Sequence, residues 1–133
     1  MSKIQKTLRK LSHNNTHALV LGSAFGILDQ ILEVYGTVFV ISTSPPAIKA
    51  RNLIYKENFV KLDHLQDMTS IFVDIDQLDH LDKIEVIWRK HNSKLFVEGN
   101  DRVENDKVKI LYDSGWACTS LQRWFHVWEQ YRK

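Results

Sequence analysis

A short run of small residues, Gly22-Ser23-Ala24-Phe25-Gly26, offers the first candidate for ligand chemistry. It follows the apolar segment His17–Gly22 and opens a segment with helical spacing. Small residues let a ligand approach the backbone closely, and the N–H groups that open a helix attract anions. A tight turn that needs glycine for its own geometry explains the same pattern. The position between strand and helix favours a ligand site, so we expect Gly22, Ser23, Ala24 and Gly26 to contact a nucleotide-type ligand.

A second candidate is the hydroxyl-rich run Ser42-Thr43-Ser44-Pro45-Pro46, which Lys49 and Arg51 follow. Hydroxyls and bases at this place hold the 2′-phosphate in proteins that bind phosphorylated dinucleotides, which makes NADP a second cofactor to consider. The same run fits a helix start, with the prolines in the first turn and residues 47–55 as the helix. We favour the helix start over the phosphate site.

Carboxylates gather after a third apolar run. They are Asp74, Asp76, Asp79 and Asp82, with His80 among them. Asp74 and Asp76 fall at the end of a strand and are candidate ligand contacts, whereas Asp79 fits a helix N-cap. We expect no metal, because further ligands at a metal-binding spacing are missing. Cys118 is the sole cysteine, cannot form an internal disulfide, and is expected to be a buried spectator thiol.

These candidates must be positioned by a regular framework. Six segments have the composition of β-strands: His17–Gly22, Thr37–Ser42, Asn58–Asp63, Ser70–Ile75, Lys94–Gly99 and Lys107–Asp113. The first, second, fourth and fifth are nearly continuous apolar runs, typical of strands buried on both faces of a parallel sheet. The remaining two alternate with lysines and suit sheet edges. Helical spacing marks four segments: Phe25–Tyr35, residues 47–55, Asp79–His91 and Thr119–Tyr131.

The alternation of strands and helices predicts the α/β class, as a three-layer Rossmann-like sandwich with a mostly parallel sheet of about six strands. We expect one domain over residues 16–133, preceded by a basic arm over residues 1–15. In such a sheet, ligands bind beyond the carboxyl ends of the strands, where the strand order reverses. Both candidate turns and the aspartates fall at those ends.

The chain resembles class I S-adenosylmethionine-dependent methyltransferases over roughly residues 17–99. The family's first motif, an acid followed by x-G-x-G-x-G, falls on residues 20–26, where Gly22 and Gly26 match. Ala24 replaces the middle glycine and Val20 replaces the acid. The family's ribose-binding acid falls at Ser42, and its later acidic positions fall at Asp63 and at Asp74 or Asp76. Because we expect a helix after Cys118, we do not expect the family's antiparallel C-terminal hairpin.

The resemblance implies S-adenosylmethionine as cofactor, bound by Gly22, Ser23, Ala24 and Gly26, with Ser42, Asp63 and Asp74 lining the cleft. A methyltransferase would then work by holding the cofactor and an acceptor in alignment. No residue stands out as a catalytic base. The alternative function is a non-catalytic interaction or scaffold protein that keeps the fold and has lost the cofactor, and the replaced acids at Val20 and Ser42 support it.

Composition limits the remaining function classes. The chain has 133 residues, 44% hydrophobic and 26% charged, and these values fit one globular domain. A single cysteine and a basic start without an apolar signal segment lead us to expect a cytoplasmic protein. No apolar stretch is long enough to cross a bilayer, so we expect no membrane partner. The basic arm could bind nucleic acid, but that partner ranks last. Four aromatic residues of the C-terminal helix, Trp124, Phe125, Trp128 and Tyr131, predict a homodimer through that helix.

Overall fold

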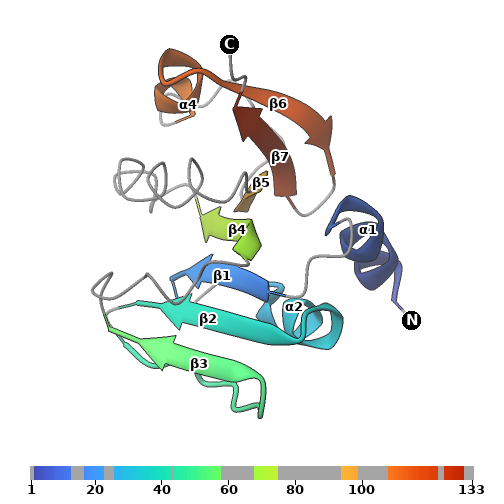
Figure 1. Ribbon diagram of the computed structural model, residues 1–133, viewed down its shortest axis with the longest axis vertical. Helices are drawn as coiled ribbons and strands as arrows, with labels where there is room; N and C mark the ends of the chain where they lie inside the picture. The colour runs from blue at the N-terminus through green and yellow to red at the C-terminus, as the bar shows by residue number, and fades with distance from the viewer. Residues whose placement is uncertain are drawn as a thin grey trace.

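The computed structural model describes residues 2–12, 17–22, 26–42, 44–57, 68–74, 94–98, 108–122 and 125–130. Seven strands form one sheet in the order β3-β2-β1-β4-β5-β7-β6 (Figure 1). Their bounds are β1 (His17–Leu21), β2 (Thr37–Ile41), β3 (Leu53–Lys56), β4 (Met68–Asp74), β5 (Lys94–Glu98), β6 (Trp116–Leu121) and β7 (Phe125–Gln130). The described helices are α1 (Lys3–Ser12), α2 (Leu28–Val34) and α4 (Lys109–Asp113).

The strands from β3 to β5 run parallel to one another, whereas β7 is antiparallel to β5 and to β6. The sheet is therefore mixed, with four parallel and two antiparallel pairings among its neighbours. The expected α/β class and the mostly parallel sheet are confirmed. The described residues form a sheet of seven strands, where about six were expected.

Strands buried on both faces explain the continuous apolar runs. In β1, Ala18 and Val20 belong to one core cluster, and Leu19 and Leu21 belong to the other. Successive side chains of a strand point to opposite faces, so both faces of the central sheet are covered. α1 and α2 add residues to one cluster and α4 adds residues to the other, which gives the described fold three layers.

The face covered by α1 and α2 holds a cluster of aromatic rings. Phe72 and Phe96 from neighbouring strands stack at a centroid distance of 4.5 Å. Phe125 meets Phe96 edge to face at 5.2 Å, and Tyr35 meets Phe72 in the same way at 5.8 Å. These offset and edge-to-face geometries are the favoured ones for aromatic pairs. The cluster joins the parallel part of the sheet to its antiparallel end.

The expected basic arm contains a helix. In α1, Ile4 and Leu8 are one helical turn apart and are buried in the cluster that also holds Phe96 and Phe125. The bases of this helix lie on its exposed side. The limits of the single domain that we expect over residues 16–133 stay a prediction.

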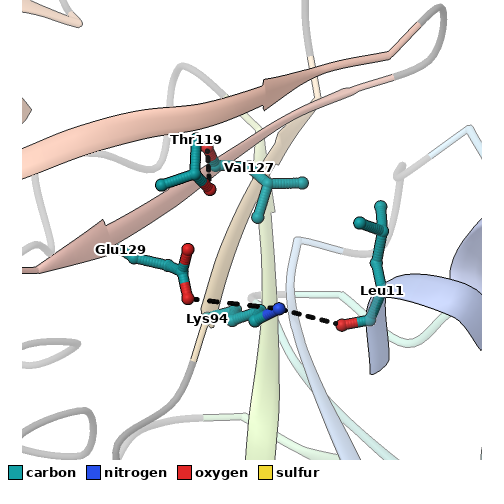
Figure 2. A network of polar contacts seen from close by, with 5 residues as sticks. All are labelled: Leu11, Lys94, Thr119, Val127 and Glu129. Carbon is teal, nitrogen blue, oxygen red and sulfur yellow. Dashed lines mark hydrogen bonds and ion pairs between the residues drawn. The ribbon is translucent and has the colours of Figure 1, made fainter. Parts of the chain in front are cut away.

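One partly buried lysine side chain fixes the end of α1 to the sheet (Figure 2). The ammonium group of Lys94 donates a hydrogen bond of 3.2 Å to the carbonyl of Leu11 and lies 4.0 Å from the carboxylate of Glu129. The last carbonyls of a helix lack partners within the helix, and a cation there also suits the helix dipole. Lys94 therefore holds α1 to both β5 and β7.

The expected helix over Thr119–Tyr131 is wrong, because this segment forms β6 and β7. Phe125 and Val127 pack on one face of the sheet, and Trp128 packs on the other. Alternation at a period of two therefore explains the buried aromatic residues better than helical spacing does. The family's C-terminal hairpin, which we did not expect, is present. Phe125 and Trp128 are buried, so these two side chains cannot form a dimer interface. The homodimer itself stays a prediction and would use other residues.

Two further expectations are corrected. The expected strand Lys107–Asp113 contains α4, and its N-cap residue Val108 and its Leu111 are both buried, three residues apart. Gly115 follows with a φ of 87°, a conformation that commonly ends a helix. The expected helix over residues 47–55 is replaced by a loop and β3, whose residues pair with β2 from Val38 to Ile41. A Pro-Pro pair favours extended backbone before it, which suits this loop.

Asn58–Asp63 and Asp79–His91 lie outside the described residues. None of the described helices has the length and hydropathy of a membrane-spanning segment.

Candidate functional site

The strand order reverses between β1 and β4, and the carboxyl ends of these two strands are called the crevice below. From β1 the chain moves outward to β2 and β3, and it then returns to the other side of β1 as β4. Connections leave these two neighbouring strands in opposite directions, and ligands bind at such switch points in open α/β sheets. The strand ends lie in register there, with Leu21 opposite both Ile41 and Val73.

Gly22 lies directly at this crevice. Its φ is 100°, a left-handed conformation that residues with a Cβ rarely adopt, so the turn after β1 requires glycine. The N–H of Gly22 donates a hydrogen bond of 2.9 Å to the carbonyl of Ile41, which fixes the start of the turn against β2. Ser23 and Ala24, the next expected ligand contacts, lie outside the described residues.

Gly26, at the other end of the same turn, contacts an acid from a distant strand. Its N–H donates a hydrogen bond of 2.8 Å to Oε1 of Glu98, the last residue of β5. A Cβ at position 26 would lie 2.6 Å from that oxygen, so a side chain there would displace Glu98. We expected this N–H group to attract an anionic ligand, but a carboxylate of the protein already accepts its hydrogen bond.

Glu98 is the residue that our sequence interpretation missed. It ends a buried strand in the same way as Asp74 ends β4, and the two residues are in register on neighbouring parallel strands. A carboxylate at the carboxyl end of a buried strand was therefore a usable signal at both positions. The distance of 72 residues between Gly26 and Glu98 hid their contact. At Val20, where the resembling family has an acid, the side chain is fully buried in the core.

Ser42 follows β2 at the same edge of the sheet, but its groups are used within its own loop. Its hydroxyl donates a hydrogen bond to the carbonyl of Ser44. Its carbonyl accepts one of 3.1 Å from the hydroxyl of Tyr55, and its N–H donates to the carbonyl of Lys56. These bonds hold the loop against β3.

The alternative phosphate site depends on Lys49 and Arg51, and both residues are exposed. Within the described residues, neither side chain forms an ion pair or hydrogen bond with the loop at Ser42. The described residues therefore do not bring Lys49 and Arg51 together with the loop at Ser42 as a phosphate site.

The remaining acidic candidates cannot be placed around the crevice. Asp63, Asp76, Asp79, His80 and Asp82 lie outside the described residues. In the part of the chain that the structure describes, no three side chains of His, Cys, Asp or Glu gather to hold a metal ion.

Cys118 lies in β6, in the antiparallel part of the sheet, and is half-buried. Burial raises the pKa of its thiol above the ordinary value of 9.0, and a hydrogen bond with the backbone of Ser120 offsets part of that effect. The thiol is therefore protonated at neutral pH, which agrees with a spectator residue instead of a nucleophile.

Solved structures of methyltransferases share this fold. A ribosomal protein L11 methylase from Lactobacillus delbrueckii subsp. bulgaricus superposes with a TM-score of 0.57 and 13% identity, over 98% of this chain and 81% of the methylase. A protein assigned as a type II methyltransferase from Anaeromyxobacter dehalogenans superposes with a TM-score of 0.53 and 16% identity, over 83% of this chain. That match spans 52% of the larger protein, so this chain corresponds to about half of it.

Sequence comparison adds no closer relative, because neither a family model nor a curated protein matches the chain. The resemblance to methyltransferases therefore rests on the fold.

Proposed function

We propose that the protein binds S-adenosylmethionine in the crevice at the carboxyl ends of β1 and β4, and that it serves methyl transfer. The observation that carries this proposal is Gly22, which holds a φ of 100° at the switch point of the sheet. The shared fold of the L11 methylase supports the choice of cofactor over other nucleotides. We keep Gly22, Ser23, Ala24, Gly26, Ser42, Asp63 and Asp74 as the proposed binding residues.

The described residues fit such a cofactor in two ways. The turn at Gly22 brings bare backbone to the crevice, where a nucleoside needs close approach. The carboxylate of Glu98 lies at the other end of the turn and adds negative charge, which suits a positively charged sulfur. S-adenosylmethionine, when bound, supplies a methyl group attached to that sulfur.

The contribution of the chain itself is positioning. Hydrogen bonds from Gly22 to β2 and from Gly26 to β5 fix both ends of the turn before a ligand arrives. A fixed turn lowers the ordering cost of holding two reactants in line. The proposal needs no covalent intermediate and assigns no catalytic base to the described residues.

Titration calorimetry tests the proposal directly. The purified chain is titrated with S-adenosylmethionine, S-adenosylhomocysteine, NAD and NADP, and we expect heat from the first two. Gly22→Ala should weaken binding at least tenfold, because alanine strains the turn. Gly115→Ala is the matched control, since Gly115 also has a positive φ but lies after α4.

Folded protein that binds none of the four ligands at millimolar concentration would refute the proposal, and the non-catalytic interaction protein would become the better explanation. An equal loss in Gly22→Ala and Gly115→Ala would place the ligand elsewhere.

A further inference from the structure

The contact between Glu98 and Gly26 links the turn of the crevice to a strand two places away. β4 lies between β1 and β5, so this hydrogen bond joins the turn after β1 to a strand that is not its neighbour in the sheet. Glu98 is half-buried and in register with Asp74, the last residue of β4. Its carboxylate therefore lies at the carboxyl ends of the strands, beside the turn of the candidate site.

We propose that Glu98 determines the charge preference of the site, so that it binds a sulfonium ligand more tightly than the neutral thioether or a phosphate-bearing dinucleotide. This inference rests on the proposed function. A negative charge beside the turn attracts a cationic sulfur and repels a diphosphate. The N–H of Gly26, which would otherwise serve an anion, is bonded to Glu98.

Close packing at Gly26 keeps the carboxylate in this place. The bare Cα of Gly26 leaves the space that Oε1 of Glu98 occupies, since a Cβ would come within 2.6 Å of that atom. The backbone at Gly26 and the side chain of Glu98 are thus complementary in shape. Glu98 acts on the ligand through its charge, and it also holds the turn through its hydrogen bond.

Glu98→Gln separates the two roles. The glutamine oxygen accepts the same hydrogen bond from Gly26, so the fold and the turn are kept while the charge is lost. We titrate S-adenosylmethionine and S-adenosylhomocysteine into the parent and the variant. The preference for the sulfonium ligand, expressed as the ratio of the two Kd values, should fall about tenfold in the variant. The affinity for the neutral thioether should change by less than about threefold.

Glu129→Gln is the matched control, because it removes the same charge from the opposite edge of the sheet, where Glu129 faces Lys94. It should leave the ratio unchanged. A second measurement uses only the parent protein, since a preference based on charge should shrink when the titrations are repeated at high ionic strength.

An unchanged ratio in Glu98→Gln overturns the inference, and so does an equal loss of both ligands, which would make Glu98 a brace of the turn alone. If Glu98→Gln fails to fold, a salt-independent ratio in the parent overturns it in the same way. Parent protein that binds neither ligand refutes the proposed function itself, so the two failures are distinct.

Discussion

At the amino ends of the parallel strands, side chains bond to backbone carbonyls and to one another, whereas the carboxyl ends of β1, β4 and β5 carry a glycine turn and two acids. Asn52 donates hydrogen bonds of 2.9 Å to the carbonyls of Leu32 and Tyr35, and Lys94 donates one to Leu11. The hydroxyl of Tyr35 donates to Ser70 inside the core at 3.0 Å. These bonds close the amino edge of the sheet.

The carboxyl edge instead has the features expected of a ligand site. Gly22 and Gly26 expose backbone, and Asp74 and Glu98 end neighbouring strands there. The bonds that stabilise the chain at the amino edge and the proposed ligand site therefore lie at opposite ends of the parallel strands. Substitutions at the amino edge should therefore change stability without changing ligand affinity, whereas those at the carboxyl edge should change ligand affinity.

The largest effect should come from the core that both edges share. Phe125→Glu places a charge among Phe72 and Phe96, and we expect a loss of about 4 kcal/mol or more, enough to unfold the chain. Leu121→Glu is the control, because Leu121 is 63% exposed on the edge strand β6. Circular dichroism and sedimentation measure both variants. A folded, monomeric Phe125→Glu variant would contradict this placement of the ring.

The amino edge is tested by Lys94→Met, which keeps the apolar stem and removes the charge. We expect a loss of about 2 kcal/mol in urea denaturation, because the carbonyl of Leu11 loses a charged donor. Glu129→Gln should cost less than about 1 kcal/mol, since its ion pair is long and partly exposed. Ligand affinity should be unchanged in both variants. A change in affinity would contradict the claim that the amino edge contributes to stability alone.

The carboxyl edge is tested by Gly26→Ala. The φ of Gly26 lies outside the left-handed region, so the expected cost of about 1 kcal/mol comes from the displaced oxygen of Glu98. In a Glu98→Ala background the same substitution should cost close to nothing, and a double-mutant cycle measures this coupling by denaturation. Additive costs would show that the two residues do not share this space in solution.

The smallest effect concerns Cys118, which lies away from both edges. Burial raises the pKa of its thiol above 9.0, so the folded protein holds this proton more tightly than the unfolded chain does. The resulting stability is fully present below pH 9.0 and is lost as the pH rises through the higher folded pKa. Urea denaturation from pH 7 upward should show this loss in the parent and not in Cys118→Ser. Fast alkylation of the parent at pH 7 would contradict the raised pKa.

The central strands could be predicted from the sequence, because strands such as Leu19-Val20-Leu21 are apolar on both faces and leave little ambiguity. The C-terminal strands could not. Phe125 to Trp128 are four consecutive buried residues, and such a run satisfies helical spacing and strand alternation equally well. α4 has five residues, which are too few to show a clear helical period. The alternating Lys107 and Lys109 therefore made this segment look like a strand.

The candidate site was predictable in its local part. Gly22 follows a buried strand, and its positive φ accords with the tight turn that was the alternative to a ligand site. The partner of Gly26 was not predictable, because the approach of Glu98 depends on the order of β1, β4 and β5 in the sheet. A pattern along the chain records which residues end strands, but it does not record which strands become neighbours.

The position of β7 has a consequence for how the chain reaches this fold during synthesis. β7 is the last described strand in the sequence, yet it lies between β5 and β6, inside the sheet. Until residues 125–130 have left the ribosome, β5 has an open edge, and Ile4, Leu8 and Phe96 lack part of their apolar contacts. Loop closure over most of the chain must precede that contact, which slows folding and lengthens the time in which a strand edge is exposed. We therefore expect a nascent chain of this protein to benefit from a chaperone until β7 has paired with β5.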